Sequence, residues 1–218
     1  VLFIFIILCL FFGCMSLKSD TMQKDIANYY SKEIDRKYKK GVDNFVYLMR
    51  LDFLSSECSD FKNPECLSRV NSTASGLVFS SDQKSVFVLT AAHFCVDQSP
   101  GTFDTKIIGF TKDLDRELYI LKKDEKNDIC LLMGVKYDHE SFNQIKLAKK
   151  DPPLGEDVYT VAAPNGVGGP GFRLVFDGKF GGCDQTGCMT TIPATFGSSG
   201  AGIYNKKGEL ITIVMAVT

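Results

Sequence analysis

Short β-type segments follow one another along most of this 218-residue chain, and this succession constrains its fold more than any other feature. Turn-forming pairs such as Pro100-Gly101, Gly181-Gly182 and Lys207-Gly208 separate the segments. The sequence predicts two sets of strands: 76–80, 84–90, 105–111, 117–122 and 129–134, then 157–162, 172–177, 188–192, 201–205 and 209–217. Ten short strands in two sets are typical of an all-β protein built as two antiparallel β-barrels or sandwiches.

A polar stretch with Pro152-Pro153 lies between the two sets, and we interpret it as the connection between the barrels. The expected boundaries are about 45–135 for the first barrel, 136–156 for the linker and 157–218 for the second barrel. His139 falls in this linker, where we expect an exposed side chain rather than a metal ligand.

The chain begins with an uncharged apolar segment, residues 1–17. Its length is at the short limit for a membrane span and suits the hydrophobic part of a signal sequence. Three interpretations stay open: a cleaved signal peptide, an uncleaved membrane anchor, and a lipoprotein signal with acylation at Cys14. All three predict an extracytoplasmic protein, either anchored in the cell envelope or secreted. Residues 18–44 are expected to form a helical stalk, with a helix over 19–40 that Gly41 ends.

Six cysteines follow the N-terminal segment: Cys58, Cys66, Cys95, Cys130, Cys183 and Cys188. In an exported chain an even set of cysteines indicates disulfide bonds, and six allow 15 connectivities. The pairs Cys58–Cys66 and Cys183–Cys188 close short loops and are the easiest to form. A zinc site is not expected, because the chain has no CxxC pair and only two histidines. The net charge of −1 gives no basis for a nucleic-acid partner.

Three segments at strand ends carry side chains that can do chemistry together: Thr90-Ala91-Ala92-His93, Asp128-Ile129-Cys130-Leu131-Leu132, and Gly197-Ser198-Ser199-Gly200-Ala201-Gly202. A serine is a weak nucleophile until a histidine takes its proton, and an acid fixes the tautomer of that histidine. Glycines beside the serine let backbone N–H groups point at one spot, as an oxyanion hole requires. The order His93, Asp128, Ser199 therefore predicts a catalytic triad.

These three segments resemble the motifs of the trypsin-like serine peptidases of the chymotrypsin fold, over about residues 72–218. Ser75-Gly76-Leu77-Val78 and the hairpin after Ser199 are similar to those of bacterial HtrA-type envelope proteases. The resemblance implies an active site between two barrels. It also implies that His93 is the general base, that Asp128 orients it, that Ser199 is the nucleophile, and that the N–H groups of Gly197 and Ser199 form the oxyanion hole.

Departures from the family pattern carry further expectations. Ser198 replaces the acid that pairs with a newly cut N-terminus in digestive relatives, so activation by such cleavage is not expected. Pro193 stands at the floor of the substrate pocket, and Met215 and Ala216 line it, which favours an apolar P1 residue. Cys95 and Cys130 both lie near the expected site and form a further candidate pair. Only 19 residues follow Ser199, so the second barrel is expected to be incomplete, with the missing strand elsewhere in a longer chain or in a partner.

The resulting hypothesis is an exported serine endopeptidase that hydrolyses protein or peptide substrates through an acyl-enzyme. It needs no cofactor and no metal. Membrane attachment is expected through residues 1–17, and no residue indicates an oligomeric state. The alternative is a catalytically silent binding module that keeps the peptidase fold, since a fold does not guarantee a function.

Overall fold

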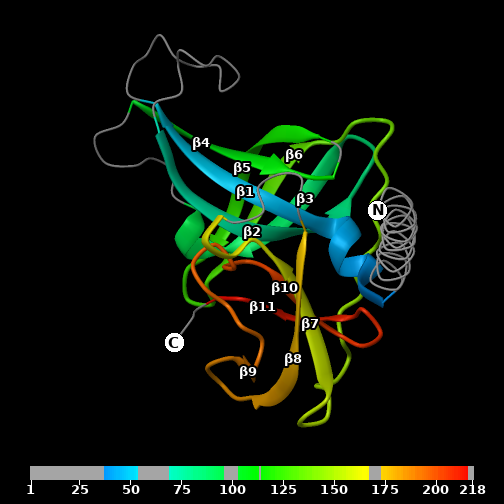
Figure 1. Ribbon diagram of the computed structural model, residues 1–218. Helices are drawn as coiled ribbons and strands as arrows, with labels where there is room; N and C mark the ends of the chain where they lie inside the picture. The colour runs from blue at the N-terminus through cyan, green and yellow to red at the C-terminus, as the bar shows by residue number, and fades with distance from the viewer. Residues whose placement is uncertain (1–36, 54–68, 96–102, 113, 167–172, 216–218) are drawn as a thin grey trace, which may run out of the picture. The chain divides into compact units, whose positions relative to one another are not determined.

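The computed structural model describes residues 37–53, 69–95, 103–112, 114–166 and 173–215 (Figure 1). The chain divides into two compact units, residues 1–39 and 40–218, and the contacts given below lie within the second. Residues 1–36, with the expected signal or anchor, and the pair Cys58–Cys66 lie outside the described residues. No helix in the described ranges has both the length and the apolar character to cross a bilayer.

The N-terminal helix ends at Asn44 and not at Gly41, so the predicted helix end is wrong. The Asn44 side chain donates a hydrogen bond to the Lys40 carbonyl (3.0 Å), which caps the last turn. Gly41 serves packing instead: a Cβ there would lie 3.0 Å from side-chain atoms of Tyr159 and Val161. The missing side chain thus lets the helix lie directly on the second barrel.

Six antiparallel strands close the first barrel, in the order β1-β2-β3-β6-β5-β4 (Figure 1). Their bounds are β1 Phe45–Phe53, β2 Arg69–Ser81, β3 Ser85–Ala91, β4 Asp104–Phe110, β5 Asp115–Asp124 and β6 Ile129–Val135. A one-turn helix, η1 (Ala92–Phe94), follows β3 directly. Buried aliphatic side chains from all six strands fill the interior, among them Leu48, Val78, Val88, Ile107, Leu118 and Leu132.

Strand β1 is absent from the sequence-based prediction, although it closes the barrel by pairing with both β2 and β4. Its first four residues are all buried, so it lacks the alternation that marks a half-exposed strand. Val46 and Leu48 face the interior of the barrel. Phe45 and Tyr47 instead pack with Val161 and Ala163 of the second barrel. A strand that is buried on both faces therefore holds the two barrels together.

The second barrel is an open five-stranded sheet in the order β11-β10-β7-β8-β9. Its strands are β7 Asp157–Ala162, β8 Leu174–Cys183, β9 Cys188–Thr190, β10 Gly202–Asn205 and β11 Leu210–Ile213, with a one-turn helix, η2 (Pro164–Gly166), after β7. A closed barrel followed by an open one confirms the predicted all-β fold with an incomplete second barrel. Gly181-Gly182, predicted as a turn, lies within β8 at a β-bulge.

The connection between the barrels is attached to both of them. Glu140 forms an ion pair with Arg116 of β5. The pair is buried: the Glu140 side chain is 4% exposed and the Arg116 side chain 3%. Burial alone would raise the pKa of Glu140, but hydrogen bonds from Arg116 and the Tyr137 N–H, with the Arg116 charge, hold it below its usual value. Further along, Lys146 and Ala148 exchange backbone hydrogen bonds with Leu210 of β11 (both 2.8 Å).

Replacing Glu140 with Gln removes the partner charge of a buried guanidinium, and we expect a loss of about 3 kcal/mol in the free energy of unfolding. Because folding lowers the Glu140 pKa, the contribution of the pair is present above the unfolded pKa and disappears as the pH falls through the folded pKa. Denaturant unfolding at neutral and acidic pH measures both effects.

The matched control is Asp157→Asn, which breaks an exposed ion pair with Lys179 of similar length (2.6 Å). Exposed pairs contribute about 0–1 kcal/mol, so this variant should stay close to the wild type. Equal losses in the two variants at neutral pH would contradict the account of the buried pair.

Candidate active site

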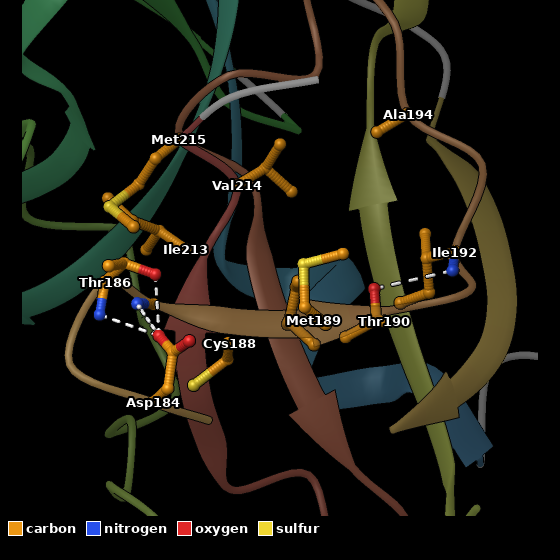
Figure 2. A pocket seen from close by; sticks show the side chains of 12 residues that line it. Asp184, Thr186, Cys188, Met189, Thr190, Ile192, Ala194, Ile213, Val214 and Met215 are labelled. Carbon is orange, nitrogen blue, oxygen red and sulfur yellow. Dashed lines mark hydrogen bonds between the residues drawn. The ribbon is translucent and has the colours of Figure 1, made fainter. Parts of the chain in front are cut away.

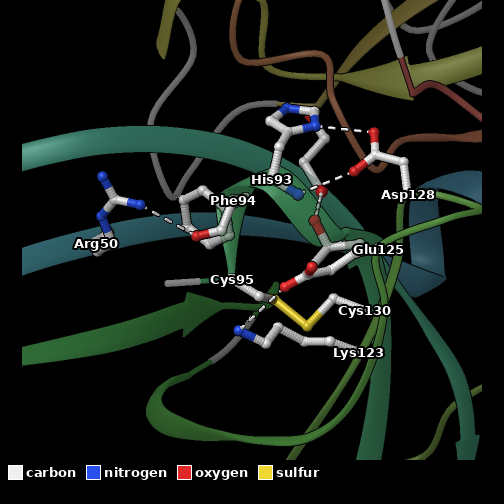
Figure 3. The surroundings of a disulfide bond; sticks show 10 residues. Arg50, His93, Phe94, Cys95, Lys123, Glu125, Asp128 and Cys130 are labelled. Atoms are coloured by element: carbon white, nitrogen blue, oxygen red, sulfur yellow. Dashed lines mark hydrogen bonds and ion pairs between the residues drawn. A yellow bond between two sulfur atoms is a disulfide. The ribbon is translucent and has the colours of Figure 1, made fainter. Parts of the chain in front are cut away.

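His93 and Asp128 meet because β3 and β6 are antiparallel neighbours. The register pairs Thr90 with Cys130 and Ala91 with Ile129, so the residues just after β3 and just before β6 lie at the same end. His93 Nδ1 lies 2.8 Å from Asp128 Oδ2, and the His93 N–H donates to Asp128 Oδ1 (2.9 Å; Figure 3). Both carboxylate oxygens thus bind one residue, which fixes the imidazole ring and its backbone together.

The backbone at Asp128 adopts an unusual conformation, with a φ of +50°. Aspartate tolerates this left-handed region better than most residues do. The turn directs the Asp128 carbonyl to the Ala92 N–H (3.1 Å), a second link between the two segments. The His93 side chain is 52% exposed and that of Asp128 27%. The carboxylate is therefore partly shielded, whereas about half of the imidazole side chain is open to solvent.

A disulfide between Cys95 and Cys130 lies beside this pair, as Figure 3 shows. Cys95 follows His93 by two residues, and Cys130 follows Asp128 by two, so the bond links the same two segments. Both cysteines are buried. The candidate pairs Cys95–Cys130 and Cys183–Cys188 are both present.

Two backbone N–H groups in the loop that carries Ser199 have no hydrogen-bond partner among the described residues. In the described part of the chain the N–H groups of Gly197 and Ser199 donate no hydrogen bond, whereas Ser198 N–H donates to Thr195 and Gly200 N–H to Val214. The carbonyl of Phe196 accepts from the Asn165 N–H. Backbone N–H groups without an internal partner are available to bind an oxyanion.

Close backbone packing brings this loop to the first barrel. Gly200 has a φ of +83°, and a Cβ there would lie 2.2 Å from Thr90 Oγ1. Thr90 precedes His93 by three residues, so the loop that carries Ser199 lies directly against the segment that leads to His93. The Ser199 carbonyl accepts a hydrogen bond from the Ser75 N–H of β2 (2.9 Å). Among the described residues, no hydrogen bond joins the Ser199 and His93 side chains.

A cavity of about 450 Å³ opens in the second barrel (Figure 2). Met215, one of the expected pocket residues, lines it, together with the apolar side chains of Ile192, Ala194, Val214 and Met189. Pro193 is exposed and is not among the lining residues, and Ala216 lies outside the described residues. Sequence reasoning missed Ile192 and Ala194, although they flank the proline that it selected.

One acid, Asp184, also borders this cavity and was not expected there. It is exposed, and hydrogen bonds from the Thr186 hydroxyl and the N–H groups of Thr186 and Gly187 lower its pKa. These bonds hold its carboxylate within the short loop that the disulfide Cys183–Cys188 closes. Thr186 and Thr190 also line the cavity, so its wall has both polar and apolar groups.

The model of the trypsin-like peptidase domain matches residues 74–213, so the chain belongs to this family, as the sequence motifs predicted. The structure is similar to that of the serine endoprotease from Yersinia pestis (TM-score 0.62, 19% identity) over 84% of this chain and 57% of that one. It is also similar to Deg5 (TM-score 0.64, 15% identity), over 86% of each chain. The chain thus spans less than two thirds of the Yersinia protein. Both likenesses agree, at the level of the fold, with the HtrA-type resemblance. No curated protein matches the chain in sequence.

Removing the Cys95–Cys130 bond through a double change to Ala should cost more stability than removing Cys183–Cys188 in the same way. Cys95–Cys130 joins residues 35 apart in sequence, and Cys183–Cys188 joins residues 5 apart. From loop-closure entropy, the two bonds are expected to contribute about 4 and about 2 kcal/mol to stability, respectively. Denaturant unfolding of both double variants under non-reducing conditions measures the difference. Equal losses would mean that the first bond constrains the unfolded chain no more than the second.

Proposed function

We propose that this protein is a serine endopeptidase that uses His93, Asp128 and Ser199. The observation that carries the proposal is the double contact of Asp128 with His93, on the ring and on the backbone. With the Nδ1 proton directed to the carboxylate, Nε2 is left to accept a proton, which is the task of a general base. The unpaired donors at Gly197 and Ser199 supply the second requirement, stabilisation of negative charge.

In the proposed reaction, Ser199 Oγ attacks the carbonyl carbon of the scissile peptide bond while His93 Nε2 takes the hydroxyl proton. The N–H groups of Gly197 and Ser199 then hold the oxyanion of the tetrahedral intermediate. His93 gives its proton to the leaving amine, and an acyl-enzyme remains. Water attacks this ester while His93 takes a proton from it. His93 then returns the proton to Ser199 Oγ, and the carboxylic acid product leaves. Asp128 stays ionised throughout and stabilises the imidazolium.

The absence of a Ser199–His93 hydrogen bond among the described residues favours a second candidate, a binding module with the peptidase fold. Nucleophile–base contacts are often loose without substrate and tighten in the complex. The two candidates therefore differ in a measurable property, the reactivity of the Ser199 hydroxyl.

Labelling with a fluorophosphonate probe tests the triad. We expect the wild type to label and Ser199→Ala and His93→Ala not to label, while Asp128→Asn should hydrolyse peptides about 10⁴-fold more slowly because its histidine takes the wrong tautomer. Ser141→Ala, at an exposed position of the linker, is the control and should label normally. A folded wild type that does not label would overturn the endopeptidase and favour the binding module.

The apolar side chains of Ile192, Ala194 and Val214 in the cavity of the second barrel support a preference for small or medium aliphatic P1 residues. Ala194→Phe should fill part of this cavity and lower kcat/KM about 10-fold or more for peptides with Leu or Val at P1, with a smaller effect for Ala at P1. Val135→Phe, on an exposed position of the first barrel, adds the same ring elsewhere and is the control. Unchanged P1 selectivity in Ala194→Phe would mean that the cavity does not receive the P1 side chain.

The two disulfides within the described residues favour an oxidising compartment, and we propose an extracytoplasmic location on this ground. Attachment through residues 1–17, by a lipid or by an uncleaved segment, stays a prediction from the sequence.

A further inference from the structure

Ser75 of β2 holds a central place between the two barrels that the proposed mechanism does not use. Its side chain and backbone are fully buried, with 0% of the residue exposed. Four hydrogen bonds converge on it. Its N–H donates to Ser199 O (2.9 Å), its hydroxyl donates to Gly197 O (2.8 Å) and accepts from the Ala163 N–H (3.0 Å), and its carbonyl accepts from Thr90 Oγ1 (2.8 Å).

Two of these bonds end on the carbonyls of Gly197 and Ser199. Within the described residues, the N–H groups of these two residues donate no hydrogen bond. One residue of the first barrel thus holds the carbonyls of both expected oxyanion donors. The Ser75 hydroxyl binds Gly197, whereas the Ser75 backbone N–H binds Ser199. A change of side chain therefore removes the first contact and keeps the second.

The peptide groups on both sides of Gly197 are held in place by hydrogen bonds. Its φ of +87° is a conformation that glycine adopts freely, and a Cβ there would lie 2.4 Å from Ala163 O. In the preceding trans peptide, the Phe196 carbonyl and the Gly197 N–H point in opposite directions. Because Asn165 holds that carbonyl, the N–H faces the other way, and the Ser75 hydroxyl fixes the following peptide.

We propose that the Ser75 hydroxyl is a positioning group for the oxyanion hole, and this inference rests on the proposed function. It acts through Gly197 and does not touch the substrate. In Ser75→Ala, Gly197 O and the Ala163 N–H both lose their partner in a buried place, whereas the bond from the Ser75 N–H to Ser199 O is retained. The peptide planes at Gly197 then rotate more freely, and the N–H that should meet the oxyanion is aligned for less of the time.

The test compares Ser75→Ala with Thr160→Val in the full chain. Thr160 is equally buried, and its hydroxyl donates to Gly202 O (2.8 Å) away from the donor residues, so its loss removes a similar bond. For peptide hydrolysis we expect Ser75→Ala to lower kcat about 10-fold or more with little change in KM. This loss lies below the cost of about 10²–10³ for removing an oxyanion donor itself. Thr160→Val should retain wild-type kcat.

A peptide aldehyde supplies a second readout, because its adduct with the nucleophile is tetrahedral like the intermediate. Its inhibition constant should rise in Ser75→Ala by about the same factor as kcat falls, and Ser75→Thr, which keeps a hydroxyl, should recover part of both. If Ser75→Ala and Thr160→Val lose equal activity, or if only KM changes, the positioning role is overturned.

Amide hydrogen exchange across residues 195–201 separates this inference from the proposed function, since it needs no activity. Faster exchange in Ser75→Ala than in Thr160→Val supports the positioning role even if the wild type proves inactive, in which case the proposed function alone fails. Equal exchange in the two variants overturns the positioning role whatever the activity.

Discussion

The antiparallel pairing of β3 with β6 is the constraint on which the candidate site depends. The register that places Thr90 opposite Cys130 brings the end of one strand to the start of the other. His93 and Asp128 follow and precede these strands, so a shift of one residue would turn their side chains to opposite faces. The Cys95–Cys130 bond and the bond from the Ala92 N–H to Asp128 O hold the same register. The pairing of β3 with β6 is thus the main reason that His93 and Asp128 lie in contact.

Several features of this arrangement could be read from the sequence because they depend on local chemistry. The all-β class followed from short β-branched runs and turn residues, and the family followed from the segments around His93, Asp128 and Ser199. Cys183–Cys188 was predictable because the intervening loop is short. Cys95–Cys130 was a candidate only through its proximity to the expected site. Periodicity gives no information on pairs of cysteines that lie 35 residues apart.

Other features depend on tertiary contacts and left no local signal. Strand β1 is buried on both faces, so it lacks alternation, and Gly41 and Gly181 look like breaks in the sequence although one lies in a helix and the other in a strand. The role of Ser75 was also hidden, because its partners Ala163 and Gly197 are far along the chain. Sequence reasoning placed Pro193 at the pocket, whereas its neighbours Ile192 and Ala194 line the cavity.

The linker between the barrels has a mechanical consequence. Glu140 is bound to the first barrel through Arg116, and Lys146 and Ala148 are bound to the edge of the second through Leu210. The linker is thus bound to each barrel within residues 140–148, and β1 also joins the barrels through its apolar side chains. A hinge motion of one barrel against the other would have to break the buried ion pair or the hydrogen bonds between the linker and β11. Relative movement of the two barrels is therefore opposed at two places, the linker and β1.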